Sequence, residues 1–212
     1  MERFIPPRST DTPTTLFSAG IGEAAIPRVH RFLRNSNPQE ILIYTDGCCL
    51  NNGKDFAKAG CAFFFRPSAA EVKGYVSFRL EHTGPSGQSH PQTSNRAELR
   101  AVIAALQFRR WDGEGFRRLV IATDSEYVVE GATVRVKKWK TNGWRTATKA
   151  PVKNRDLWEF LMEQIAVANH RGVHVSFWRI PREQNVDADA AAKAVANDPD
   201  RATFAKIVGV LV

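Results

Sequence analysis

Cysteine is scarce in this chain, and long apolar runs are missing. Its three cysteines, Cys48, Cys49 and Cys61, show no CxxC spacing, so neither a disulfide framework nor a zinc site is predicted. No apolar stretch approaches the roughly 20 residues that span a bilayer. The first residues lack the basic start and apolar core of a secretory signal, and acidic residues interrupt what would be an acid-poor transit peptide. We therefore expect an intracellular protein of the nucleus or cytoplasm without a membrane partner, with mitochondrial import less favoured.

Acidic residues are too few to balance the basic ones. The chain has 212 residues and a formal net charge of +8, from 30 Lys and Arg against 22 Asp and Glu. This balance favours a polyanionic partner, and nucleic acid is the leading candidate. The length suits one domain with an appendage. No feature predicts a protein partner, so we expect a monomer.

The first 39 residues lack sustained helical or strand periodicity and contain five prolines among Ser, Thr and scattered charges. We expect residues 1–39 to form a loosely ordered extension. Residues 40–198 form the predicted main domain, and 199–212 a tail. The apolar end of that tail, 208–212, is expected to dock on the domain or on a partner.

The main domain alternates between short β-rich apolar runs and stretches with apolar residues at i, i+3, i+4 and i+7. We expect strands over 41–45, 60–65, 72–80, 119–122 and 173–177, and helices from 95 onward, over 156–170 and over 185–196. The order predicts an α/β fold, with a five-stranded mixed sheet whose first three strands are antiparallel and helices on both faces.

Four acidic residues lie where these elements would converge. Asp46 and Asp124 follow the first and fourth strands, Glu98 lies near the first turn of a helix, and Asp189 lies on the last helix. Strand ends in such sheets form the functional crevice. Taken singly, each acid is as well explained as a helix cap or a solvent-facing side chain. A cluster of them would need cations to offset repulsion, which predicts bound Mg²⁺ or Mn²⁺.

The strings around these acids resemble, in order, the four motif blocks of type 1 ribonuclease H. They are YTDGCCLNNG (44–53), TSNRAEL (93–99), ATDSEYV (122–128) and NVDAD (185–189). The resemblance covers about 41–198 and implies an RNase H-like fold and catalytic domain. It also implies that Asp46, Glu98, Asp124 and Asp189 are catalytic and bind two Mg²⁺ ions, for which Mn²⁺ can substitute. The implied activity is endonucleolytic hydrolysis of the RNA strand of RNA/DNA hybrids by a two-metal-ion mechanism, giving 5′-phosphate and 3′-hydroxyl ends.

Asp187 is the alternative to Asp189 for the fourth acidic role. The family spaces its asparagine and its catalytic aspartate four residues apart, which matches Asn185 and Asp189. We therefore prefer Asp189 and expect Asp187 to face elsewhere on the helix.

Residues 131–155 contain no acid, and two tryptophans lie among the cations of RVKKWKTNGWRT (135–146). A basic stretch is usually a solvated face, but these cations can bind phosphates, while the tryptophans pack the segment or contact sugars. The segment resembles the basic protrusion, or handle, with which many family members hold the DNA strand, and Thr146 corresponds to a phosphate-binding threonine. Nucleic-acid contacts are expected from Lys138, Trp139, Lys140, Trp144, Thr146 and Lys153.

Telling RNA from DNA requires contacts to the 2′-hydroxyl in the minor groove. By the resemblance, Cys49, Asn52 and Asn95 make groove contacts, although Asn52 also fits a turn. Two further expected contacts depart from the family pattern. Ser94 stands where asparagine is common, and Glu126 where glutamine is frequent, which adds negative charge near the duplex.

A histidine that most bacterial and animal members carry in a loop before the last helix is missing. The shorter PREQN (181–185) replaces it, and Arg182 or Glu183 could take over part of its function. Metal-bound water can attack without that base, so we expect slower turnover or an altered metal preference.

The departures motivate an alternative function, a weakly active or inactive duplex-binding protein that retains the RNase H fold. Intact carboxylates at all four acidic positions argue against it. A third hypothesis, a stand-alone domain derived from a reverse transcriptase, concerns origin more than activity. No amino-terminal hybrid-binding domain is recognised in residues 1–39, so processivity on long hybrids is not predicted.

Overall fold

Five strands form the centre of the structure. A computed structural model describes residues 1–69 and 72–209, so 210–212 of the expected apolar end lie outside the described residues. The strands lie side by side in the order β6 (Tyr75–Arg79), β5 (Lys58–Phe64), β4 (Asn37–Leu50), β7 (Arg118–Thr123) and β8 (His174–Arg179). Pairing is antiparallel among β4, β5 and β6 and parallel from β4 through β7 to β8. The predicted mixed sheet with three antiparallel strands is confirmed.

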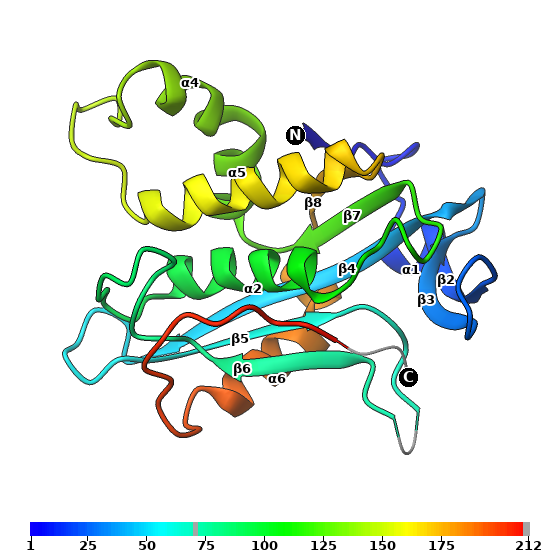
Figure 1. The fold of residues 1–212 in the computed structure, drawn as a ribbon, viewed down its shortest axis with the longest axis horizontal. Helices are drawn as coiled ribbons and strands as arrows, with labels where there is room; N and C mark the ends of the chain where they lie inside the picture. The colour runs from blue at the N-terminus through cyan, green and yellow to red at the C-terminus, as the bar shows by residue number, and fades with distance from the viewer. Residues whose placement is uncertain (70–71, 210–212) are drawn as a thin grey trace.

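Helices cover both faces of this sheet, as the pattern predicted. The helices α2 (Ser94–Phe108) and α5 (Arg155–His170) pack on one face, and α6 (Val186–Val195) packs on the other against β4 and β5 (Figure 1). Alternation along β4 explains the two layers, because side chains in a strand point to opposite faces. Ile41 and Ile43 enter the core under α2, whereas Leu42 joins a second apolar cluster on the far face.

The first 39 residues do not form the loosely ordered extension that we expected. They contain β1 (Glu2–Arg3), α1 (Pro13–Leu16), β2 (Phe17–Gly22) and β3 (Val29–Arg34). The strand β1 pairs with β8, while β2 and β3 form a hairpin that pairs with β4, so the sheet has eight strands among the described residues.

Aromatic packing explains why this amino-terminal segment is ordered. The Phe4 ring lies 4.8 Å from Trp178, and the Phe17 ring 6.5 Å from it, measured between centroids. These rings cover the face of β7 and β8 that α2 and α5 leave open. Burial of each aromatic ring stabilises the fold by about 2 to 3 kcal/mol, which favours an ordered segment over a free one.

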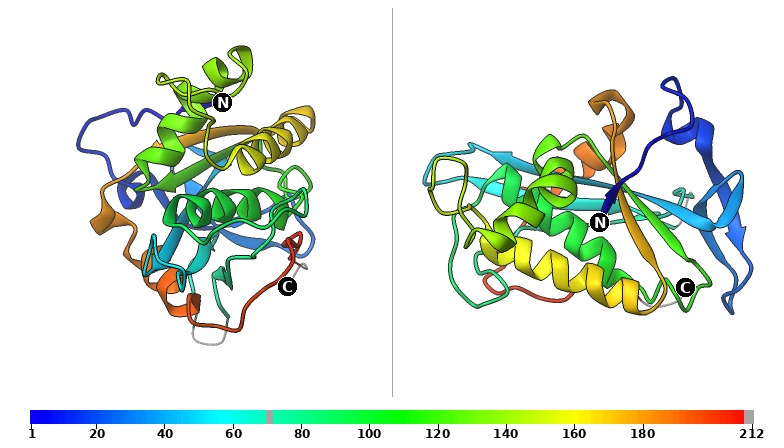
Figure 2. Two further views of the ribbon diagram at one scale, coloured as in Figure 1. Left: turned by 90° about the vertical axis from the view of Figure 1, so that its left-hand side faces the viewer. Right: turned by 90° about the horizontal axis from the view of Figure 1, so that it is seen from above.

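The basic segment forms a projection at one end of the molecule. It comprises the π-helix η1 (Gly131–Arg135), α4 (Val136–Thr141) and the loop that returns to α5, and α3 (Glu126–Glu130) leads into it (Figures 1 and 2). A 3₁₀ turn, η2 (Arg182–Gln184), precedes α6. None of the helices within 1–69 and 72–209 is long and apolar enough to cross a membrane.

Candidate active site

Strand register places Asp46 beside Asp124. The last paired residues of the parallel strands β4 and β7 are Tyr44 and Ala122. Asp46 and Asp124 each follow two residues later, on neighbouring strands that are about 4.8 Å apart. Asp46 is 6% exposed. On the other side of β4, it lies opposite Ala62 of the neighbouring strand β5. The two aspartates therefore belong to one end of the sheet.

Glu98 reaches this end because α2 crosses β4 at very short range. A Cβ atom added to Gly47 would lie 2.1 Å from the backbone nitrogen of Glu98, so only glycine allows the approach. The Oγ of Ser125 then donates a hydrogen bond of 2.5 Å to Oε2 of Glu98. The same hydroxyl accepts from the backbone nitrogen of Val128 and caps α3. Ser125 thus fixes Glu98 relative to the end of β7.

Asn185 ties the last helix to the same place. It is 1% exposed, and its Nδ2 donates to Oδ1 of Asp124 at 2.9 Å and to the backbone oxygen of Thr45 at 3.1 Å. The sequence prediction did not include Asn185 or Ser125 among the site residues. Both carried a signal, since Asn185 is four residues before Asp189 and Ser125 is a cap-forming residue directly after Asp124.

Asp189 is held by two cations. Its Oδ1 accepts from the guanidinium of Arg182 at 2.7 Å, and its Oδ2 pairs with Nζ of Lys193 one helical turn later. The i, i+4 spacing of Asp189 and Lys193 on α6 favours the second of these pairs. Asp189 is largely buried, whereas the two cations are about half or more exposed.

Electrostatics show that the four acids share one environment. The pKa of Asp46 is raised to about 7, by burial first and then by the negative charges of Asp124, Asp189 and Glu98, against a hydrogen bond from the Gly47 backbone. Burial likewise raises the pKa of Glu98, which the Ser125 hydrogen bond partly offsets. Such a site carries more negative charge than its surroundings stabilise, and a cation would relieve this.

The side chains fit a hard divalent cation by their donor chemistry. Carboxylate oxygens are the ligands that Mg²⁺ and Mn²⁺ prefer, and the buried Oδ1 of Asn185 has no hydrogen-bond partner. Within the described ranges, however, no three His, Cys, Asp or Glu side chains are grouped tightly enough to hold a metal ion. Arg182 and Lys193 each pair with one oxygen of the Asp189 carboxylate, so they compete with a cation for its negative charge.

Asp187 lies apart from the acids. Its side chain is exposed, and its charge acts on Tyr44, whose pKa is raised to about 12 by burial first and by Asp187 second. The charges that raise the pKa of Asp46 most, after burial, are those of Asp124, Asp189 and Glu98. The structure thus brings Asp189 to the other three acids and directs Asp187 elsewhere.

The residues expected to contact the groove lie around this site. Ser94 and Asn95 occupy the first turn of α2, about one turn before Glu98. Asn52 is exposed in the turn after β4, and the half-buried thiol of Cys49 lies 3.5 Å from the Gln92 carbonyl oxygen.

The negative charge of Glu126 has a partner. Its carboxylate is exposed and pairs with Arg179 at 2.9 Å. The sequence prediction treated this charge as unfavourable for a duplex. Because Arg179 is at the end of β8, the pair is close to neutral, and the cost of placing Glu126 near phosphates is reduced.

The expected nucleic-acid contacts in the handle divide into two kinds. Lys138, Lys140 and Lys153 are exposed. Trp139 and Trp144 are each only 8% exposed, and their rings lie 6.2 Å apart. The structure therefore supports packing of the tryptophans, which was one of the two roles considered for them, rather than contact with sugars. Thr146 is half-buried at the tip, with its Oγ1 3.0 Å from that of Thr148.

Packing joins the handle to the catalytic end of the sheet. The Trp139 ring packs against Trp158 of α5, with 5.5 Å between centroids, and Trp158 Nε1 donates to the Tyr127 hydroxyl at 3.0 Å. A Cβ atom on Gly131 would lie 2.1 Å from the Trp158 ring, so glycine is needed where η1 begins. Since Tyr127 is three residues after Asp124, the handle is fixed relative to the acids.

Comparison with known proteins gives consistent matches. The sequence model of the RNase H family matches residues 38–197. A ribonuclease H of Treponema pallidum is 43% identical over 123 residues, which cover 57% of this chain and 70% of that protein. A ribonuclease H of Paramagnetospirillum magneticum is 36% identical over 157 residues, covering 74% and 89%. The crystal structure of LC9-RNase H1, described as a type 1 RNase H with the type 2 active-site motif, aligns with a TM-score of 0.51 and 30% identity, covering 74% of this chain and 72% of that one.

Proposed function

The chain belongs to the ribonuclease H family, and from this membership we propose that it is an endonuclease that hydrolyses the RNA strand of RNA/DNA hybrids with divalent cations. One observation supports this most strongly. Burial, and after it the charges of Asp124, Asp189 and Glu98, raise the pKa of Asp46 to about 7, as expected where several carboxylates lie together at a cation site.

The four carboxylates would hold the cations, which we propose to be a pair of Mg²⁺ ions, with Mn²⁺ as a substitute. Bound there, these ions would supply a water nucleophile at neutral pH and stabilise charge on the leaving 3′ oxygen. The chain's own residues set the position of the ligands. Asn185 orients Asp124, and Ser125 orients Glu98. Arg182 and Lys193 neutralise the Asp189 carboxylate in the cation-free protein.

Substrate binding would use two surfaces on either side of the acids. Cys49, Asn52, Ser94 and Asn95 would read the groove and its 2′-hydroxyls. The exposed lysines of the handle would bind phosphates of the DNA strand. The buried tryptophans would keep that handle rigid rather than contact the substrate. We propose a monomer that works in the nucleus or cytoplasm.

Arg182 lies in the loop that lacks the family's histidine, and its chemistry differs from that of a histidine. A guanidinium remains protonated at all physiological pH values, so it cannot take a proton from the nucleophile or give one to the leaving group. It can only stabilise negative charge near Asp189. Turnover slower than that of histidine-containing relatives is the expected consequence.

Cleavage of defined substrates tests this proposal. Purified protein would be incubated with a 5′-labelled RNA/DNA hybrid, duplex RNA and duplex DNA, each with Mg²⁺, Mn²⁺ or EDTA. We expect cation-dependent cleavage of the hybrid RNA strand and products with 5′-phosphate ends. The Asp124→Asn variant preserves the acceptor for Asn185 and removes the charge, so it is the matched control. Hybrid binding without any cleavage would contradict the enzyme and support the duplex-binding alternative.

A further inference from the structure

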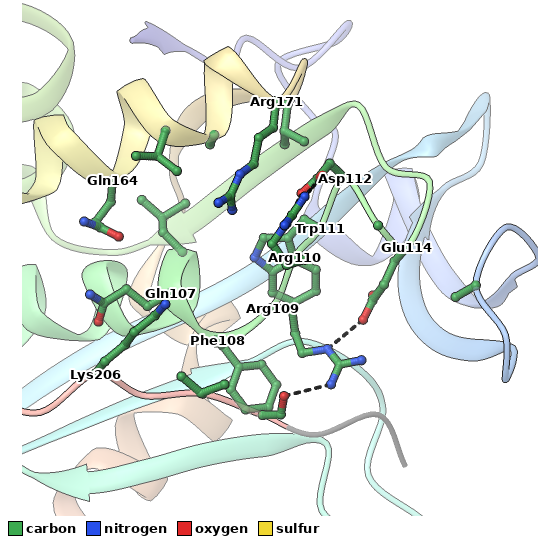
Figure 3. Close-up of a pocket in the computed structure, with 18 of the residues that line it drawn as sticks. Gln107, Phe108, Arg109, Arg110, Trp111, Asp112, Glu114, Gln164, Arg171 and Lys206 are labelled. Atoms are coloured by element: carbon green, nitrogen blue, oxygen red, sulfur yellow. Dashed lines mark hydrogen bonds and ion pairs between the residues drawn. The ribbon is translucent and has the colours of Figure 1, made fainter.

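A second cavity lies at the end of α2 that points away from the acids. It has a volume of about 560 Å³ and lies between the end of α2, the loop that follows it, the end of α5 and the carboxyl-terminal tail (Figure 3). Glu98 and Phe108 are ten residues apart on α2, which corresponds to about 15 Å. The volume is within the range of about 300 to 1,000 Å³ that is common for small-molecule sites.

The inner wall of this cavity is apolar. Leu106, Phe108, Trp111 and Val173 line it from the main core. The rim is also apolar at several points, since Ile26 is 93%, Val208 65% and Val167 44% exposed. Exposed large apolar side chains that gather at one concave place indicate a binding surface, because water contact is costly for them.

Among the residues that the structure describes, the acids around the cavity form their ion pairs with cations other than Arg171 and Lys206. Glu114 pairs with Arg31 and with Arg109 at 2.8 Å. Asp112 pairs with Arg110, whose hydrogen bond lowers the pKa of Asp112 most, and the charge of Arg171 lowers it further.

Arg171 and Lys206 form no ion pair with any residue of 1–69 or 72–209. In Figure 3, Arg171 points into the cavity from α5, and Lys206 points into it from the tail. Two cations that converge over an apolar wall are complementary to a ligand that joins an anionic head to an apolar body.

We propose that this cavity binds a small organic carboxylate with an aromatic or aliphatic body. The carboxylate lies between Arg171 and Lys206, and the body packs against Phe108, Trp111 and Val173. The amides of Gln107 and Gln164 provide further polar groups on the wall. The proposal does not depend on nuclease activity, because the cavity shares no residue with the acidic site.

The test is a titration of the isotopically labelled full-length protein with 4-phenylbutyrate, followed by amide chemical shifts. We expect saturable shifts confined to residues near 25–26, 106–114, 164–173 and 206–209. A dissociation constant in the millimolar range or tighter is expected for a ligand of about 12 heavy atoms. The double variant Arg171→Gln and Lys206→Gln should weaken binding by tenfold or more. Arg118→Gln, an exposed arginine that does not line the cavity, should leave it unchanged.

Two further probes test the two halves of the proposed ligand. The neutral analogue 4-phenylbutan-1-ol should bind at least tenfold more weakly, because it lacks the charge. Inorganic phosphate should not saturate the same signals at equal concentration, because it lacks the apolar body. Equal binding of either probe, or shifts that spread over other parts of the protein, would overturn the proposal.

Discussion

Replacing Asp46 with asparagine should stabilise the cation-free protein at alkaline pH and abolish its cleavage activity. The carboxyl group of Asp46 is 6% exposed and has a pKa of about 7 instead of the ordinary 3.8. Between these values, the folded chain retains a proton that the unfolded chain has released. The free energy of unfolding therefore falls as pH rises from about 4 to about 7, and it remains low above that. Asparagine has the same shape without this titration.

The magnitude follows from the difference between the two pKa values. A tenfold change in proton affinity corresponds to about 1.4 kcal/mol, so the interval from 3.8 to about 7 sets an upper limit of about 4 kcal/mol. Because the four carboxylates titrate as a coupled group, only part of this free energy depends on Asp46 alone. We expect Asp46→Asn to gain about 2 kcal/mol at pH 8, or a rise in Tm of roughly 4 to 8 °C.

Thermal and urea unfolding in EDTA at pH 4 and pH 8 would measure this gain. It should appear at pH 8, vanish at pH 4, and be reversed by saturating Mg²⁺, which stabilises the wild type and not the variant. Asp187→Asn is the matched control, because that carboxylate is exposed and its charge acts on Tyr44. An equal gain at both pH values, or a loss of stability at pH 8, would refute the reasoning.

Three other variants, one of them a double substitution, test separate parts of the structure. Asn185→Ala removes two buried hydrogen bonds and should cost about 1 to 3 kcal/mol and at least tenfold in cleavage rate; an unchanged rate would show that Asp124 needs no such support. Replacing Lys138 and Lys140 with alanine should lower the salt dependence of hybrid binding by about two phosphate contacts, measured as the slope of log affinity against log salt, and an unchanged slope would remove the handle from the interface. Gly131→Ala places a methyl group against Trp158 and should destabilise the fold by about 1 to 3 kcal/mol, measured by urea unfolding; a neutral effect would mean that η1 can move aside.

The acids were predictable because short buried strands determine where the residues that follow them lie. Asp46 and Asp124 come after runs of apolar residues that can only be central strands, and parallel pairing of β4 with β7 makes them neighbours. What was not predictable is that Arg182 also holds Asp189. Arg182 is exposed in a 3₁₀ turn, and the sequence pattern does not indicate where a flexible guanidinium points.

The amino-terminal segment was mispredicted for a physical reason. Its hairpin strand β3 buries Arg31 on the inner face, where an apolar residue is usual, and a buried pair with Glu114 at 2.7 Å compensates that charge. The partner is 83 positions away, so local alternation appeared to be broken.

The handle tryptophans illustrate a different case. Either surface contact or packing was compatible with their sequence, and only the tertiary contact with Trp158 decides between the two roles.

The central claim is that four carboxylates act as one cation-dependent site. Cleavage assays on variants in which one carboxylate is replaced by its carboxamide test this claim most directly. The measurement is the single-turnover rate on a labelled RNA/DNA hybrid with saturating Mg²⁺, for wild type, Asp46→Asn, Glu98→Gln, Asp124→Asn, Asp189→Asn and Asp187→Asn. The account predicts that the first four variants each lose at least about 100-fold, comparable to removing a group that acts only in the transition state, while Asp187→Asn cleaves like the wild type. Near-normal cleavage by Asp189→Asn, or a large loss in Asp187→Asn, would contradict it.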